Sequence, residues 1–270
     1  MKHTIHHLMA ALFTATSLST AAPLVIGHRG ASAVAPENTV ASIKEAWKEG
    51  ADGNEVDIYL TKDGKLVTIH DKTTERTTGV DLDVRGSTLE QLSALDAGSW
   101  KDPKWKGERI PTLVESLAAV PAGKIIYIEI KGGAEVLPEL RKVIDASGKA
   151  KDEIFLIDFK LENLVEAKPL FPDIRKLWIV GAKTDKETKK KTYPDVKDLA
   201  AQAKAAGMDG LDLNHGFPMD ADDMAAIKQN GLLLAVWTVN EAEVAERWVK
   251  AGADAITTDK PEVIRKSLAK

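Results

Sequence analysis

The sequence predicts a single α/β domain, a (β/α)8 TIM barrel with a small insertion after the second strand. Short apolar runs typical of buried strands alternate with helix-like segments, which indicates βαβ units and a parallel sheet. The length of 270 residues suits one closed barrel, and no low-complexity linker divides the chain. Because the order of strands in a sheet cannot be read from sequence, a doubly wound open sheet is the alternative.

The predicted strands number eight if Lys65–His70 belongs to the same unit as the strand before it, and eight favours closure into a barrel. They are Leu24–His28, Asn54–Leu60, Lys65–His70, Ile125–Lys131, Glu153–Phe159, Ile174–Val180, Gly210–Asn214, Leu232–Val239 and Ala253–Thr258.

The predicted helices carry apolar residues on one face, and several end in a glycine, as helix C-termini often do. The first, Glu37–Gly50, places Val40, Ile43 and Trp47 on one side. The others are Thr112–Val120, Val136–Ser147, Glu162–Phe171, Val196–Gly207, Ala221–Gly231 and Glu241–Gly252. The longest irregular stretch, about residues 72–109, is predicted to be an inserted loop or small subdomain.

Residues 1–22 are predicted to be a secretory signal peptide, so that the barrel domain occupies residues 23–270. Lys2 precedes the apolar stretch Leu8–Leu18, and small residues follow it. The stretch is shorter than the roughly 20 apolar residues of a transmembrane helix, so no stable membrane insertion is expected. An uncleaved membrane anchor and a disordered tail are the alternatives. We expect an exported protein, periplasmic or secreted, which the absence of cysteine fits.

The net charge of −4 argues against a nucleic-acid partner. The sequence predicts no oligomeric state.

Three carboxylates are predicted to point into the barrel. Alternate residues of a strand face the same way, so Glu55 and Asp57 share one face, and Glu129 shares a face with Lys131. Buried carboxylates are costly unless they are paired or bind a cation. Three of them provide hard oxygen ligands for one divalent cation, Ca²⁺ or Mg²⁺. The alternative is a network of buried ion pairs, such as Glu55 with Arg29.

Two histidines are predicted to lie at the mouth of the barrel, where such folds carry their chemistry. His28 ends the first strand and His70 ends the run after Asp57. A histidine pair can act as base and acid near neutral pH. The cationic Arg29 and Lys131 nearby indicate an anionic small-molecule substrate, and a phosphodiester fits them.

These residues resemble the glycerophosphodiester phosphodiesterase family, in its compact bacterial type. The resemblance spans nearly the whole chain after the signal segment, because the motifs occur in the same order and at similar spacing. They are His28-Arg29-Gly30, Pro36-Glu37-Asn38-Thr39, Glu55-x-Asp57, the turn 60–64 (LTKDG), His70-Asp71, the strand 128–131 (IEIK), and the segments 236–240 (VWTVN) and 252–261 (GADAITTDKP).

The resemblance implies the same barrel with an insertion after its second strand, metal ligands at Glu55, Asp57 and Glu129, and acid/base histidines at His28 and His70. It also implies phosphate-binding residues at Arg29 and Lys131, and a pocket wall at Trp237. The implied activity is metal-dependent hydrolysis of glycerophosphodiesters, such as glycerophosphocholine or glycerophosphoethanolamine, to glycerol 3-phosphate and an alcohol. The alternatives are a phospholipase D-like lyase acting on lysolipids or sphingolipids, and an exported protein that binds phosphodiesters without cleaving them.

The chain departs from the family pattern at two positions. Asn54 stands where an apolar residue usually precedes the first metal-binding glutamate, and Asp158-Phe159 stands where a Ser-Phe pair is usual. We expect Asp158 to cap the following helix, since aspartate is a good N-cap, and altered substrate choice is the alternative. His215 is equally consistent with substrate contact and with a surface loop.

Overall fold

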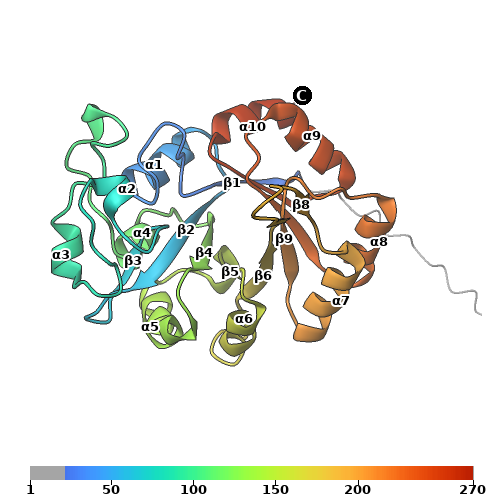
Figure 1. Cartoon of the computed structure of the whole chain (residues 1–270), viewed down its shortest axis with the longest axis horizontal. Helices are drawn as coiled ribbons and strands as arrows, with labels where there is room; N and C mark the ends of the chain where they lie inside the picture. Colours follow the sequence, from blue (N-terminus) through green and yellow to red (C-terminus); the bar gives the residue numbers. More distant parts are fainter. Residues whose placement is uncertain (1–21, 270) are drawn as a thin grey trace, which may run out of the picture.

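The computed structural model describes residues 22–269, which form a closed barrel of parallel strands with helices outside it (Figure 1). The strands run in the order β1-β11-β10-β9-β6-β5-β4-β2, and an additional pairing between β1 and β2 closes the sheet. The predicted (β/α)8 barrel is therefore confirmed, and the open-sheet alternative is wrong. The barrel strands are β1 (Leu24–Gly27), β2 (Gly53–Leu60), β4 (Ile125–Ile130), β5 (Ile154–Asp158), β6 (Arg175–Val180), β9 (Gly210–Asn214), β10 (Leu233–Trp237) and β11 (Ala255–Thr258).

The third predicted strand is not part of the barrel wall. Residues Leu66–Thr68 form β3, which pairs antiparallel with β2. Its pairing partners on β2 end at Leu60, so the two strands form a hairpin around the turn at residues 61–65. His70 lies two residues beyond the end of β3, and it therefore belongs to the loop that follows. The barrel count of eight holds because this run belongs to the unit of the strand before it.

Helices cover the outside of the barrel between successive strands, as Figure 1 shows. The unpredicted elements include α10, which begins at Pro261 and follows the last strand, and the small hairpin of β7 (Lys183–Thr184) and β8 (Lys191–Thr192). The hairpin lies in the lysine-rich segment, and its strands are exposed. The helices around the barrel are α1 (Val40–Lys48), α4 (Leu113–Ala118), α5 (Leu137–Ala146), α6 (Leu161–Ala167), α7 (Val196–Ala206), α8 (Ala221–Gln229), α9 (Ala242–Ala251) and α10 (Pro261–Leu268).

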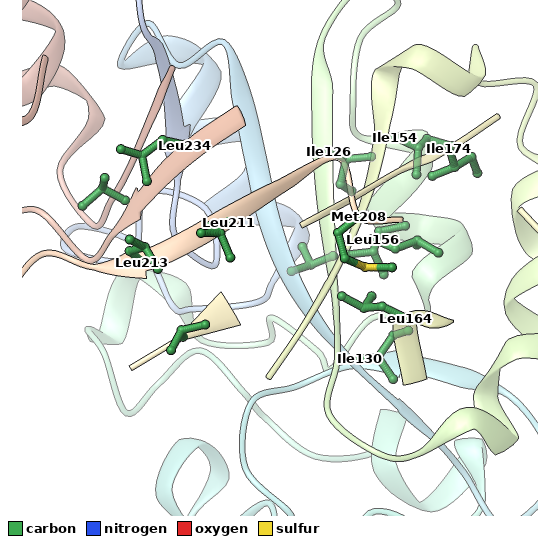
Figure 2. Close-up of a cluster of buried hydrophobic side chains, with 14 of the residues drawn as sticks. Ile126, Ile130, Ile154, Leu156, Leu164, Ile174, Met208, Leu211, Leu213 and Leu234 are labelled. Carbon is green, nitrogen blue, oxygen red and sulfur yellow. The ribbon is translucent and has the colours of Figure 1, made fainter. Parts of the chain in front are cut away.

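The barrel has two apolar cores, one on each face of its wall. Outward-facing strand residues pack against the helices, and Figure 2 shows part of this layer, including Ile126, Leu156, Leu164 and Leu211. Inward-facing residues form a smaller cluster that fills the barrel interior. It contains Ile26, Tyr127, Phe155, Ile157, Leu177, Ile179, Ala235 and Ala255. Polar side chains that point inward above this cluster therefore sit on an apolar floor.

The segment between β3 and α4 carries the insertion and has an apolar cluster of its own. It contains the short helices α2 (Glu75–Thr78) and α3 (Leu89–Ser93) and the 3₁₀ turn η1 (Pro103–Trp105). Its core includes Val84, Leu92 and Ile110, which pack with Tyr59 of β2. Within residues 22–269, none of the helices is both long and apolar enough to cross a membrane. The predicted signal peptide lies almost wholly outside the described residues.

The first predicted helix starts later than expected. It begins at Val40, and the Thr39 side chain caps it by accepting a hydrogen bond from the Ser42 N–H. Glu37 and Asn38, expected to open this helix, lie in the preceding loop, where Asn38 has a positive φ of 57°. That loop conformation frees both side chains to reach across to the barrel mouth.

The corner after β1 depends on Gly30. Its φ is +88°, and a Cβ there would lie 2.2 Å from Ser42 Oγ and 2.5 Å from the Ser42 carbonyl carbon. The Ser42 hydroxyl donates to the Arg29 carbonyl at 2.8 Å, which fixes the same corner against α1. Only glycine therefore lets the chain turn here while α1 stays close to β1.

We expect Gly30→Ala to lower the free energy of unfolding by about 2–5 kcal/mol, because left-handed strain adds to a backbone clash. Gly64→Ala is the matched control: Gly64 has a φ of +73°, and a Cβ there would meet nothing within 4 Å. Its cost should be only about 1–2 kcal/mol of backbone strain. Urea unfolding of both variants measures the difference, and equal losses would contradict the close packing at Gly30.

Candidate active site

The three predicted metal ligands converge inside the barrel mouth. Glu55 and Asp57 alternate along β2 with outward-facing Val56, and Glu129 on β4 pairs in register with Asp57. Each carboxylate offers an oxygen, and these oxygens all lie within 4.8 Å of one another. All three residues are buried. The strand alternation that the sequence predicted therefore produces a compact cluster of three carboxylates.

The electrostatics of this cluster reflect burial and mutual repulsion. Burial, with the negative charges of Asp57 and Glu129, raises the pKa of Glu55 well above its usual range. Burial and Asp57 raise the pKa of Glu129 to about 8, against the opposing effect of Lys131. Burial alone would also raise the pKa of Asp57, but Arg29 and Lys131 outweigh it and hold that pKa low. Burial and mutual repulsion thus make the charged forms of Glu55 and Glu129 costly in the free protein.

Ion pairs account for only part of the cluster. Lys131 Nζ lies 2.8 Å from Glu129 Oε1 and 3.5 Å from Asp57 Oδ1, and Arg29 Nε lies 3.3 Å from Asp57 Oδ2. Glu55 Oε1 and Asp57 Oδ1, both buried, have no hydrogen-bond partner within residues 22–269. Two buried oxygens without hydrogen bonds, beside a third carboxylate, are a donor set that suits a hard divalent cation. The residues present therefore fit such an ion.

The ring of His28 is held by Asp259, a carboxylate near the end of the sequence. His28 directly follows β1, and its Nδ1 lies 2.7 Å from Asp259 Oδ1, just beyond β11. Asp259 also accepts hydrogen bonds from Ser32 Oγ and Asn240 Nδ2. Burial would raise the pKa of Asp259, but these hydrogen bonds and the charge of His28 outweigh it and hold the pKa well below its usual range. His28 lines the pocket, and within residues 22–269 its Nε2 makes no hydrogen bond.

His70 has an equivalent carboxylate partner in its own loop. Its Nδ1 lies 2.8 Å from Asp71 Oδ1, and Arg76 of α2 binds Asp71 Oδ2 at 2.5 Å. Arg76 also donates to both oxygens of Glu37, at 2.7 and 2.8 Å. Burial lowers the pKa of His70, and Arg29 and Lys131 add to this effect while Asp57 opposes it. Arg76, which belongs to the insertion, therefore connects the loop that carries His70 and Asp71 with the loop before α1 that carries Glu37.

Arg29 links the His28 corner to the carboxylate cluster. Its backbone N–H donates to Glu55 Oε2 at 2.8 Å, and its Nη1 donates to Glu37 at 2.9 Å. Its φ of 54° is left-handed, which is uncommon for a residue with a side chain. Asn38 completes the link because its side chain bonds both the Asp57 carboxylate and the Asp57 N–H. The corner is thus fastened to β2 by backbone and side-chain contacts.

A pocket of about 380 Å³ opens onto these groups. The predicted residues His28, Arg29, Glu55, His70, Glu129, Lys131 and Trp237 all line it. Phe159 and Trp237 form one wall, with ring centroids 5.4 Å apart in an edge-to-face arrangement. The Trp237 indole N–H donates to the Asp212 carbonyl at 3.1 Å, which fixes the ring against β9. The lining thus combines cationic, acidic and aromatic side chains, and Lys131 Nζ lies 5.8 Å from the centroid of the Phe159 ring.

A profile of the Glycerophosphoryl diester phosphodiesterase family matches residues 28–263. The chain belongs to this family. Among its relatives, the glycerophosphodiester phosphodiesterase of Caldanaerobacter subterraneus subsp. tengcongensis is 35% identical over 247 residues, which cover 89% of this chain and 96% of that one. A glycerophosphodiester phosphodiesterase of Bacillus subtilis is 31% identical, with coverage of 90% and 85%.

Solved structures agree with the glycerophosphoryl diester phosphodiesterase fold. A phosphodiesterase of Oleispira antarctica, solved with its product sn-glycerol 3-phosphate, superposes with a TM-score of 0.81 at 29% identity, covering 92% of this chain and 97% of that one. The glycerophosphodiester phosphodiesterase of Thermotoga maritima gives 0.71 at 28% identity, with coverage of 90% and 97%. The predicted family and enzyme class, a phosphoric diester hydrolase, are therefore confirmed.

Several groups at the site were not predicted as functional. Asn38, Asp71 and Asp259 lie within the motifs quoted above, yet their contacts with the site depend on the fold. Arg76 lies in the insertion, and its only sequence signal is a charge near His70. Phe159, Asp212 and Thr257 line the pocket, and the sequence signal for Asp212 is a polar residue between two leucines of a strand.

Three other polar residues have structural positions. Asp158 accepts hydrogen bonds from the Lys160 N–H and the Asn163 side chain, although the N-cap residue of α6 is Lys160 itself, so Asp158 braces the turn before the helix. Burial raises the pKa of Asp158 to about 6. His215 is outside the residues that line the pocket, and its carbonyl accepts from the Trp248 indole. Asn54 is buried and faces α1, where it donates to the Ile43 carbonyl.

We expect Asp259→Asn to reduce stability at pH 7 by about 1–3 kcal/mol, because the carboxylate loses charge-assisted hydrogen bonds. Since the folded state depresses this pKa, its contribution is present above the unfolded pKa of about 3.9 and is lost as the pH falls below it. The gap between wild type and variant should therefore shrink at pH 3, as measured by urea unfolding. Asp222→Asn, at a side chain that is 81% exposed, is the control. A gap of constant size would argue against the depressed pKa.

Proposed function

We propose that the protein hydrolyses glycerophosphodiesters, such as glycerophosphocholine and glycerophosphoethanolamine, to glycerol 3-phosphate and an alcohol. One observation carries the proposal: two histidines, each with a carboxylate at Nδ1, line a pocket together with Glu55 and Glu129, two of the three convergent carboxylates. Family membership supports the reaction class, and the product bound to the Oleispira antarctica phosphodiesterase is the one expected here.

Glu55, Asp57 and Glu129 are proposed to hold one divalent cation, Ca²⁺ or Mg²⁺. When bound, such an ion polarises a phosphoryl oxygen and neutralises charge that develops in the transition state. The chain supplies the rest of the phosphate site. Arg29 and Lys131 provide cationic donors at the pocket, and their ion pairs with the carboxylates hold them there in advance of substrate.

His28 and His70 are proposed to move the protons. Each ring is oriented by its carboxylate at Nδ1, which leaves Nε2 for the substrate. We assign His28 as the base that takes a proton from the nucleophile, which is either a glycerol hydroxyl or water. His70 then protonates the leaving oxygen as the bond between that oxygen and phosphorus breaks. If the hydroxyl attacks first, the product of this step is a cyclic phosphate, which water opens with the two roles reversed.

The acid role of His70 requires that it carry a proton when substrate is bound. Arg29 and Lys131 help to lower its pKa in the free pocket. A phosphodiester anion between these cations offsets their charge and favours protonated His70.

Export of the protein, periplasmic or secreted, is proposed from the signal-like residues 1–22.

We expect His28→Ala and His70→Ala each to lower kcat by about 10²- to 10⁴-fold, the usual size of an acid/base contribution. The measurement is glycerol 3-phosphate release from glycerophosphocholine. His215→Ala, which removes a histidine outside the pocket, should leave kcat nearly unchanged. Near-normal turnover by His28→Ala would exclude the proposed base. Turnover of lysolipid with release of a cyclic phosphate, in place of glycerophosphocholine hydrolysis, would favour a phospholipase D-like lyase.

We expect EDTA to abolish glycerol 3-phosphate release, and Ca²⁺ or Mg²⁺ to restore it. Binding should also stabilise the fold, by about 2.7 kcal/mol at a cation concentration 100 times Kd, because it relieves repulsion among buried carboxylates. Glu129→Gln should lose most of this gain in thermal unfolding, whereas Glu90→Gln, on the exposed face of α3, should keep it. A stability that does not respond to either cation would count against the metal site.

A further inference from the structure

Two buried polar side chains of the pocket take no part in the chemistry above. Asp212 lies on β9 and Thr257 on β11, and each is only 2% exposed. Asp212 Oδ1 and Thr257 Oγ1 have no hydrogen-bond partner within residues 22–269. Both residues line the same pocket as the histidines. A buried polar group without a partner is costly, so two of them in one pocket indicate a ligand that satisfies both.

The barrel topology places Asp212 far from the metal ligands. In the closed order of eight barrel strands, β9 stands opposite β2, which carries Glu55 and Asp57. The inward-facing residues that neighbour Asp212 in register are Ile179 on β6 and Ala235 on β10. Ala235 pairs in turn with Ala255, two residues before Thr257. The inward-facing residues of β10 and β11 beside Asp212 are thus both alanine, and the larger Trp237 follows two residues after Ala235 on β10.

The environment of Asp212 indicates which chemistry it suits. Burial alone, without a charged partner, raises the pKa of Asp212 to about 8. Burial therefore favours the neutral carboxylic acid, which offers one O–H donor and one carbonyl acceptor. The Thr257 hydroxyl likewise donates and accepts. Such a pair suits a neutral hydroxyl group, whereas Arg29 and Lys131, which line the same pocket, suit the phosphate.

We propose that Asp212 and Thr257 form a subsite that binds the terminal hydroxyl of the glyceryl group of the substrate. This inference rests on the proposed function, because it takes the phosphate to lie at Arg29, Lys131 and the carboxylate cluster. The apolar floor and the Trp237 ring, which donates to the Asp212 carbonyl, would exclude water from this hydroxyl. The two residues thereby determine specificity for a glyceryl phosphodiester over one built on a diol that lacks this hydroxyl.

The test is a comparison of two ligands by titration calorimetry on the full protein with Ca²⁺ or Mg²⁺ present. One ligand is sn-glycerol 3-phosphate, and the other is propane-1,2-diol 1-phosphate, which lacks only the terminal hydroxyl. We expect the wild type to bind the first more tightly by about 10- to 100-fold, because the second leaves buried polar groups unsatisfied. Asp212→Leu and Thr257→Val should each bring this ratio close to one.

Two further variants separate recognition from folding and from charge. Asp212→Leu should raise the melting temperature, because it removes a buried carboxyl without a partner, so weak binding cannot be attributed to unfolding. Asp212→Asn keeps a donor and an acceptor without an ionisable group, and it should retain most of the ligand preference. If Asp212→Asn loses the preference as fully as Asp212→Leu does, the neutral-acid role is wrong.

Failure of the subsite and failure of the proposed function give different results. Equal affinity of the wild type for both phosphates, or no measurable affinity for either, would overturn the subsite whether or not glycerophosphocholine is cleaved. A clear preference for sn-glycerol 3-phosphate without hydrolysis of glycerophosphocholine would leave the subsite intact and remove the proposed activity. A variant that changes only the preference for a choline substrate would assign Asp212 to a cationic head group and overturn the proposal.

Discussion

The burial of three carboxylates inside one end of a barrel is the constraint on which the rest of the structure depends. Like charges held within 4.8 Å in an apolar interior repel one another strongly, and burial makes each harder to ionise. The cationic side chains of Arg29 and Lys131 lie close to these carboxylates and reduce the repulsion. The Asn38 side chain and the Arg29 N–H donate hydrogen bonds to them. Burial, together with the charge of Asp57, outweighs these groups at Glu55 and Glu129, whose pKa values stay raised. The remaining repulsion is what a divalent cation would relieve.

The backbone at the barrel mouth is shaped by the same requirement. Arg29 adopts a left-handed conformation so that its N–H reaches Glu55 while its side chain reaches Asp57 and Glu37. Gly30 then turns the chain against Ser42 of α1, in a space that no other residue fits. Strain of this kind persists only where surrounding contacts over-determine it. Here the contacts come from β2 and α1 together, so the position of His28 is coupled to the carboxylate cluster that it would serve.

The sequence allowed the barrel and most of the pocket to be predicted, because both follow from local patterns. Strand alternation is sufficient to orient Glu55, Asp57 and Glu129 inward, and a strand end is sufficient to bring His28 to the mouth. The partners of the histidines do not follow from local patterns. Asp259 lies 231 residues from His28, and Arg76 reaches Asp71 and Glu37 only because the insertion folds back over the mouth. The late start of α1 was also missed, since the positive φ of Asn38 serves a contact with Asp57.

The buried carboxyl of Asp212 lowers the stability of the free protein, and such a cost can indicate a residue that recognises a ligand. Nothing in its surroundings, within the described residues, compensates the burial of its carboxyl. On stability alone an apolar residue would be favoured at this position, since the neighbouring inward residues Ile179 and Ala235 are apolar. A residue that destabilises the free protein contributes only when a ligand supplies its missing partner. The same reasoning applies to the carboxylate cluster, in which Glu55 and Asp57 lie on β2, opposite β9. The cluster and Asp212 are therefore two sites with buried oxygens that lack a hydrogen-bond partner within the described residues. A substrate with a phosphate at one end and a hydroxyl at the other would satisfy both sites at once, and this would link the proposed specificity for the glyceryl group to the proposed site of phosphate chemistry.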